Sequence, residues 1–197
     1  FDAVLYATGR KPNTANIGLE NTDITTNERG AIVVNDTCES SVPGVYAVGD
    51  VNGGPQFTYI SLDDFRIVFG ALTGNGQYTL KDRKNIPYTT FLTPPLARIG
   101  LTEEDAINKG YTVKTKEMLV ATMPRAHVND YLKGAFKIVV NADNDLILGA
   151  TLYSQGAEEL INLIKMAMDN NIPYTYFKNQ IFTHPTMAEN LNDLCNF

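Results

Sequence analysis

The stretch AFKIVVNADNDLILGATLY, residues 135–153, indicates how the second half of the chain folds. Two runs rich in apolar residues, 135–140 and 146–153, flank the polar segment 141–145. Such runs are typical of β-strands, and a short polar connection between two of them is typical of a hairpin. The stretch therefore predicts two paired strands of an antiparallel sheet.

The segments on either side of this hairpin extend it to an α+β domain. Further strand-like runs occupy residues 88–92, 97–101 and 112–122. Thr102-Glu103-Glu104-Asp105 has the pattern of a capping box and predicts a short helix that ends at Gly110. Residues 156–170 place their apolar side chains along one side of a helix. Together these segments predict an antiparallel sheet with helices on one face.

The first 80 residues have a different pattern, in which short apolar runs alternate with turns. The runs at 1–7, 31–34 and 45–48 predict three buried strands. The third strand ends in Gly49-Asp50, and the glycine-rich loop 52–55 follows it.

A helix is predicted after this loop. Its apolar stripe consists of Leu62, Phe65, Phe69 and Leu72. Thr58 or Ser61 can cap its start, and Gly74 ends it. The charged segment 81–85 then predicts a domain boundary, so residues 1–80 and 86–197 are expected to form separate domains.

Composition argues against some classes of partner. The formal charge is −6 and the isoelectric point is about 4.9. Nucleic acids and anionic membranes bind clustered Lys and Arg, and the chain has no basic run. No apolar stretch has the length of a membrane span, and no signal-peptide pattern is present. We therefore expect no nucleic-acid or membrane partner, and a cytoplasmic protein whose lone thiols stay reduced.

The cysteines and histidines do not form a metal-binding pattern. Cys38, Cys195, His127 and His184 are far apart, and none has the spacing of metal ligands. We expect no metal site. A lone cysteine such as Cys195 is more often inert than an exchangeable thiol. The segment Met123–His127 holds a cation and an imidazole between strands, which predicts a surface or subunit-contact turn.

Gly49-Asp50 places a carboxylate at the end of a predicted strand. Ligands bind beyond strand ends in α/β sheets, and a glycine lets a cofactor approach the backbone. The Asp50 carboxylate can accept hydrogen bonds from sugar or ribityl hydroxyl groups. Free amides near Phe57 and Thr58, at the start of the next helix, would favour negative charge such as that of a reduced flavin. The alternative is that Asp50 is a turn residue and the loop is only a connector.

His184 is the other candidate for chemistry. It precedes a proline, which disfavours helical geometry in the preceding residue, so its ring is expected to project from a loop. Glu189 follows five residues later and can orient the imidazole as a carboxylate-linked acid/base pair. The alternative is a capping box, in which Thr186 is the N-cap of a helix and Glu189 is its third residue. Both interpretations can hold at once.

Taken in order, these motifs resemble the flavin-dependent pyridine nucleotide–disulfide oxidoreductases, such as glutathione reductase, dihydrolipoamide dehydrogenase and mercuric reductase. The resemblance covers essentially the whole chain. It rests on Ala7–Thr14, Gly30 with its strand, Val42–Val51 and His184-Pro185-Thr186-x-x-Glu189.

The resemblance implies a fold, cofactors and site residues. Residues 1–80 would be the last segment of the NAD(P)- and FAD-binding region. Gly49 and Asp50 would lie at the ribityl–pyrophosphate part of FAD, and Phe57 and Thr58 at the isoalloxazine. Residues 86–197 would form the interface domain of a homodimer. His184 would then act in the partner's active site, with Glu189 as its orienting residue, on a disulfide or small-molecule substrate.

Residues 187–194 resemble a bacterial branch of the family that reduces oxidised chlorine species, hypothiocyanous acid or copper, more than glutathione reductase itself. The tail Cys195-Asn196-Phe197 departs from that branch. The substrate and the choice between NADH and NADPH stay open.

Some family features are not in this sequence. The glycine-rich FAD and NAD(P) loops and the C-x-x-x-x-C redox pair of the family are not found. The chain also begins within an apolar run, so we expect a segment of a longer enzyme. Without a thiol pair near a flavin, we expect this polypeptide alone to hold no FAD and to be inactive.

Two other classes remain as alternatives. One is a non-catalytic dimerisation or interaction module that shares the interface fold. The other is a relative that uses a single cysteine, as in NADH oxidases and peroxidases, although these lack the His-Pro-Thr-x-x-Glu pattern.

Overall fold

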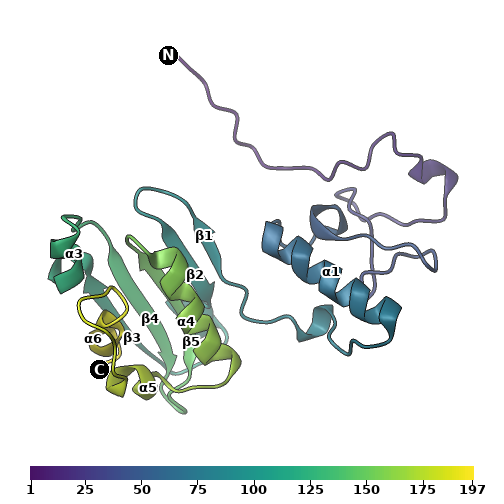
Figure 1. Ribbon diagram of the computed structural model, residues 1–197. Coiled ribbons are helices and arrows are strands. Elements are labelled where there is room, and N and C mark those ends of the chain that lie inside the picture. Colours follow the sequence, from purple (N-terminus) through teal and green to yellow (C-terminus); the bar gives the residue numbers. More distant parts are fainter. The chain divides into compact units, whose positions relative to one another are not determined.

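A computed structural model describes residues 1–197 (Figure 1). The chain divides into two compact units, Phe1–Arg83 and Lys84–Phe197. The second unit contains a five-stranded sheet whose pairs are all antiparallel, together with helices. The α+β fold class predicted from the sequence is therefore confirmed.

The sheet has the strand order β1-β2-β5-β4-β3. Its strands are β1 (Tyr88–Thr90), β2 (Leu96–Gly100), β3 (Val113–Leu119), β4 (Ala135–Asn141) and β5 (Ile147–Tyr153). The predicted hairpin is present, since β4 pairs with β5 and Ala135 lies opposite Tyr153. The five strands predicted for this domain all exist, with boundaries within three residues of the prediction.

One face of this sheet forms the core. Phe136, Ile138 and Leu152 alternate along β4 and β5 and are fully or almost fully buried. The helix α4 (Ala157–Asp169) contacts β2 and β5, and its buried residues include Ile161 and Ile164. The helix α6 (Asn190–Leu194) contacts β3 and β4 and packs against α5 (Tyr174–Asn179) (Figure 1). These helices give the sheet its apolar layer.

The short helices differ from the prediction in two places. The predicted capping box is present at α2 (Glu103–Asn108), where Thr102 and Asp105 exchange hydrogen bonds. This helix lies on the opposite face of the sheet from α4, so helices are not confined to one face. The predicted turn at 123–127 is instead the helix α3 (Pro124–Val128), because buried Met123 and Ala126 anchor it in the core.

The three strands predicted in the first unit are not formed. Residues 1–7 are exposed and have no strand partner. The runs at 31–34 and 45–48 each make one isolated bridge, Thr26 with Ile32 and Glu39 with Tyr46. A strand needs a neighbouring strand to hydrogen-bond its backbone amides and carbonyls. No segment of this unit forms more than one such bridge with these runs. Four short 3₁₀ helices complete the chain: Leu19–Asn21, Gly49–Asn52, Leu80–Asp82 and Val120–Thr122.

The helix α1 (Thr58–Thr73) ends at Gly74 as predicted, but its buried side is different. Its buried residues are Ile60, Asp64 and Ile67, whereas the predicted apolar stripe is exposed. Neither Thr58 nor Ser61 is the N-cap, because Phe57 occupies that position. No helix of the chain combines the length and the apolar character that a membrane span requires.

Candidate functional site

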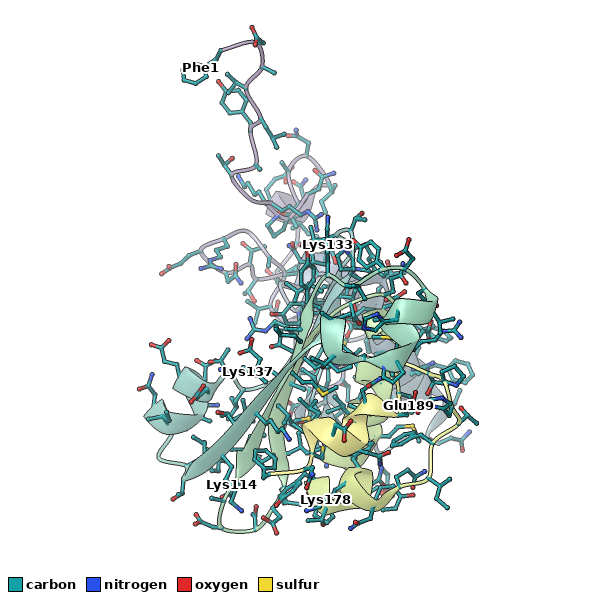
Figure 2. The ribbon with its side chains drawn as sticks, turned by 90° about the vertical axis from the view of Figure 1, so that its left-hand side faces the viewer. Phe1, Lys114, Lys133, Lys137, Lys178 and Glu189 are labelled. Atoms are coloured by element: carbon teal, nitrogen blue, oxygen red, sulfur yellow. The ribbon has the colours of Figure 1, made fainter.

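His184 and Glu189 form a hydrogen-bonded pair in the second unit. His184 Nδ1 lies 2.7 Å from Glu189 Oε2. The histidine side chain is 68% exposed, whereas that of Glu189 is 18% exposed. Figure 2 labels Glu189 on the turn that leads into α6. The chain therefore presents an imidazole to its surroundings while holding the carboxylate against the protein.

The capping interactions considered from the sequence are also present. The Thr186 amide donates to Glu189 Oε1 at 3.0 Å, and the Glu189 amide donates to Thr186 Oγ1 at 3.2 Å. The turn precedes the helix, however, because α6 begins at Asn190 and Glu189 is its N-cap. One carboxylate thus serves both purposes: Oε1 closes the turn and Oε2 holds the imidazole.

The electrostatics of the pair are consistent with an ionised carboxylate. The hydrogen bond from His184 is the main cause that lowers the pKa of Glu189, and the Thr186 amide adds to it. A lowered pKa means that the stabilisation from this carboxylate is complete above its ordinary value of 4.5. It is lost as the pH falls below that value through the lowered pKa.

The hydrogen bond also determines the tautomer that suits the pair. An ionised carboxylate only accepts hydrogen bonds, so Nδ1 is the donor. In the neutral ring Nε2 is then the acceptor, and no group of the chain binds it. The arrangement can take up a proton at Nε2 and release it again.

Three side chains that the sequence did not single out support the turn. Buried Asn190 donates from Nδ2 to the Thr186 and Met187 carbonyls, both at 3.1 Å. Asn192 Nδ2 donates to carbonyls of the segment 177–180. Lys116 Nζ, from β3, donates to the Asp193 and Asn196 carbonyls at 2.8 and 2.6 Å. Asn and Lys in a short polar helix or a strand carry no sequence signal for such contacts.

The predicted cofactor residues belong to the first unit. Gly49 is buried and has a φ of +72°, which glycine adopts without strain. Asp50 is exposed in the 3₁₀ helix Gly49–Asn52 and not at a strand end as predicted. Phe57, the N-cap of α1, stacks on Tyr59 with ring centroids 5.0 Å apart. The exposed Thr58 between them is the first residue of α1. The amide of Thr58 is at the first helical position, which has no acceptor within a helix.

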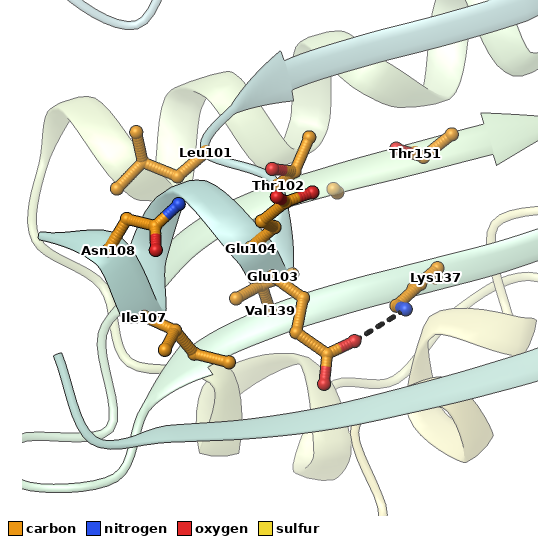
Figure 3. A pocket seen from close by; sticks show the side chains of 10 residues that line it. Leu101, Thr102, Glu103, Glu104, Ile107, Asn108, Lys137, Val139 and Thr151 are labelled. Atoms are coloured by element: carbon orange, nitrogen blue, oxygen red, sulfur yellow. Dashed lines mark hydrogen bonds and ion pairs between the residues drawn. The ribbon is translucent and has the colours of Figure 1, made fainter.

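A cavity of about 550 Å³ lies elsewhere, between α2 and the sheet (Figure 3). Glu103 of α2 and Lys137 of β4 form an ion pair of 2.7 Å across it. Its lining contains residues of the predicted capping box but none of the site residues predicted from the sequence.

Both cysteines are buried. Burial, with the nearby Asp64, raises the pKa of Cys38 to about 11, and burial raises that of Cys195 to about 12. Both are therefore thiols at neutral pH, the form that does not act as a nucleophile.

Comparison with known proteins identifies the family. The dimerisation domain of pyridine nucleotide-disulphide oxidoreductases matches residues 86–195, and a second pyridine nucleotide-disulphide oxidoreductase domain matches residues 1–64. The chain belongs to the pyridine nucleotide-disulphide oxidoreductase family. The resemblance noted in the sequence is thereby confirmed.

Individual relatives agree with this assignment. The probable pyridine nucleotide-disulfide oxidoreductase RclA of Escherichia coli is 48% identical over 98% of this chain and 44% of its own length. A mercuric reductase of Staphylococcus aureus is 36% identical over 96% of this chain and 35% of its own length. The solved structure of the HOCl-induced flavoprotein disulfide reductase RclA from Escherichia coli matches with a TM-score of 0.93 at 47% identity, over 96% of this chain and 43% of that one. The chain thus spans less than half the length of these relatives.

Proposed function

We propose that the chain supplies the FAD-contacting turn and the dimerisation domain of an FAD-dependent oxidoreductase that uses NAD(P)H to reduce a disulfide or a related oxidised substrate. The observation that carries the proposal is the 2.7 Å hydrogen bond between an exposed imidazole and a partly buried carboxylate. The family assignment and the identity to RclA support the redox class.

His184 is the acid/base of the proposed reaction. Reduction of a disulfide releases thiolates that need protons, and thiol oxidation releases protons. His184 Nε2 is the atom that accepts and donates them, while Glu189 fixes the ring through Nδ1. The family match to a dimerisation domain supports a homodimer in which His184 serves the partner's active site.

The turn at Gly49–Asn52 is the proposed FAD contact. The residues fit such a ligand: the positive φ of Gly49 shapes the turn, and the exposed Asp50 carboxylate can accept hydrogen bonds from hydroxyl groups. The N-terminus of α1, at Thr58 beside Phe57, offers the amide of Thr58 and a positive dipole end to an electron-rich ring edge. FAD, when bound, supplies the electron transfer between NAD(P)H and the substrate.

The test is replacement of His184 in the full-length protein that contains this chain. We expect His184→Ala to lower turnover about a hundredfold or more, the range of a general acid/base. Glu189→Gln should lower it less, because one side-chain oxygen remains as an acceptor. His127→Ala is the matched control, since His127 is the only other histidine and bonds to the Ala121 carbonyl.

The measurement is steady-state NAD(P)H oxidation across pH, with the flavin absorbance as a check on cofactor content. A His184→Ala protein that turns over like the wild type at every pH would contradict the proposal. The domain would then be a dimerisation module without a catalytic residue of its own.

A further inference from the structure

The side chain of Asp64 on α1 is completely buried, with 0% of its surface exposed. A buried carboxylate is costly unless its oxygens are fully paired. Asp64 Oδ2 accepts the Gly49 amide at 2.7 Å and Asn52 Nδ2 at 2.9 Å. Its other oxygen, Oδ1, pairs with the Arg83 guanidinium. Asp64 thus connects α1 directly to both ends of the proposed cofactor turn.

Asn52 extends this connection over the rest of the turn. Its Nδ2 also donates to the Ala47 carbonyl at 3.3 Å, and its Oδ1 accepts the Gly54 amide at 3.0 Å. The turn also lies close against the helix, because a Cβ added at Gly49 would be 2.9 Å from Ser61 Oγ. Asp64 is one helical turn beyond Ser61, so both residues face the same loop.

We propose that Asp64 is a positioning residue for the cofactor, which holds the turn Gly49–Asn52 on α1 so that the exposed Asp50 carboxylate and the start of α1 bind one FAD molecule together. This inference rests on the function proposed above. Asp64 itself touches no ligand, since it is buried beneath the turn. It acts by fixing the Gly49 backbone and Asn52 with a charge that Arg83 compensates.

Asp63 is the control residue that distinguishes a positioning role of Asp64 from that of an ordinary ion pair with Arg83. Its Oδ2 accepts Arg83 Nε at 2.7 Å and Tyr78 Oη at 3.4 Å, but the carboxylate makes no bond to the turn. If the cluster only held Arg83, the loss of either carboxylate would act alike. If Asp64 positions the turn, only Asp64 should influence the cofactor.

The experiment compares Asp64→Asn and Asp63→Asn in the full-length protein. Each apoprotein is titrated with FAD, and binding is followed by flavin fluorescence and the visible absorption band. We expect Asp64→Asn to weaken FAD binding about tenfold to a hundredfold, as for a lost hydrogen bond to a charged group. Asp63→Asn should stay within about twofold, the range of a partly exposed ion pair. Equal affinities in the two variants would overturn the inference.

A second variant covers the case in which Asp64→Asn does not fold. Asn52→Ala removes the bridge to the turn but leaves the pair of Asp64 with Arg83 in place. It should weaken FAD binding in the same direction and shift the flavin band. Unchanged FAD binding in Asn52→Ala would overturn the inference.

Asp50→Ala distinguishes this inference from the function on which it rests. If Asp50→Ala and Asp64→Asn both leave FAD binding unchanged, the cofactor turn itself is wrong. If Asp50→Ala weakens binding while Asp64→Asn does not, only the positioning role is wrong.

Discussion

At the scale of single residues, each of the two candidate sites depends on one residue that meets two structural requirements at once. The Glu189 carboxylate closes its own turn with one oxygen and holds His184 with the other. Gly49 combines a positive φ with a close approach to Ser61. Such residues tolerate little change because each substitution breaks more than one interaction.

Gly49→Ala tests this at the proposed cofactor turn. The new Cβ would meet Ser61 Oγ at 2.9 Å in addition to the strain of a φ of +72°. Gly44→Ala is the control, since Gly44 has a φ of +79° but no atom within 4 Å of the added Cβ. We expect about 1–2 kcal/mol of destabilisation from backbone strain in both variants, and a further cost only at Gly49. Hydrogen exchange of the full chain over residues 45–65 measures the difference, and equal exchange in the two variants would refute it.

At the scale of elements, the position of α6 determines where the His184 turn lies. Lys116 of β3 donates to two carbonyls at the C-terminal end of α6, where cations are favourable. Buried Leu191 and Leu194 fix the other side of this short helix in the core. The sheet therefore supports the catalytic candidate through a strand that is distant in sequence.

Lys116→Met should loosen this end of the chain. We expect a loss of about 1 kcal/mol or more, because two hydrogen bonds from a cation disappear. Lys114→Met is the matched control on the same strand face, since Lys114 makes a half-exposed ion pair of 3.4 Å with Asp145 and lies 5.8 Å from the centre of the Tyr174 ring, but makes no hydrogen bond to α6. That pair is worth about 0.5 kcal/mol or less. Hydrogen exchange over residues 184–197 should rise in Lys116→Met alone, and an equal rise in both variants would contradict the role of Lys116.

At the scale of the whole molecule, the domain match predicts association. Residues 86–195 match a dimerisation domain, and the second unit exposes large apolar side chains, including Phe91, Val128 and Ile181. The proposed action of His184 on a partner's substrate requires such a dimer.

Sedimentation of the 197-residue chain tests this directly. We expect a dimer at micromolar concentration through the second unit. The exposed Phe65 and Phe69 of α1 could also cause association, so Phe65→Ser/Phe69→Ser is the control, and its dimer should persist. A strictly monomeric wild type would count against the proposed role of His184 in the partner subunit.

Local patterns in the sequence were sufficient for much of the second unit. The hairpin 135–153, the capping box at Thr102 and the helix that ends at Asp169 depend on alternation, capping and helical periodicity, which neighbouring residues determine. The pairing of His184 with Glu189 was predictable for the same reason, since only five residues separate them.

The first unit shows where such patterns fail. Apolar runs at 1–7, 31–34 and 45–48 have strand-like composition, but a strand forms only when a partner supplies its hydrogen bonds. The burial of Asp64 rather than Phe65 on α1, and the contact of Lys116 with α6, depend on residues far away in the chain. The amino-acid sequence by itself determined the family, the sheet and the pairing of His184 with Glu189, because these follow from the order and local spacing of residues. Only the tertiary structure decided which side of α1 is buried and which distant side chains hold the two turns, because those contacts exist only once the chain has folded.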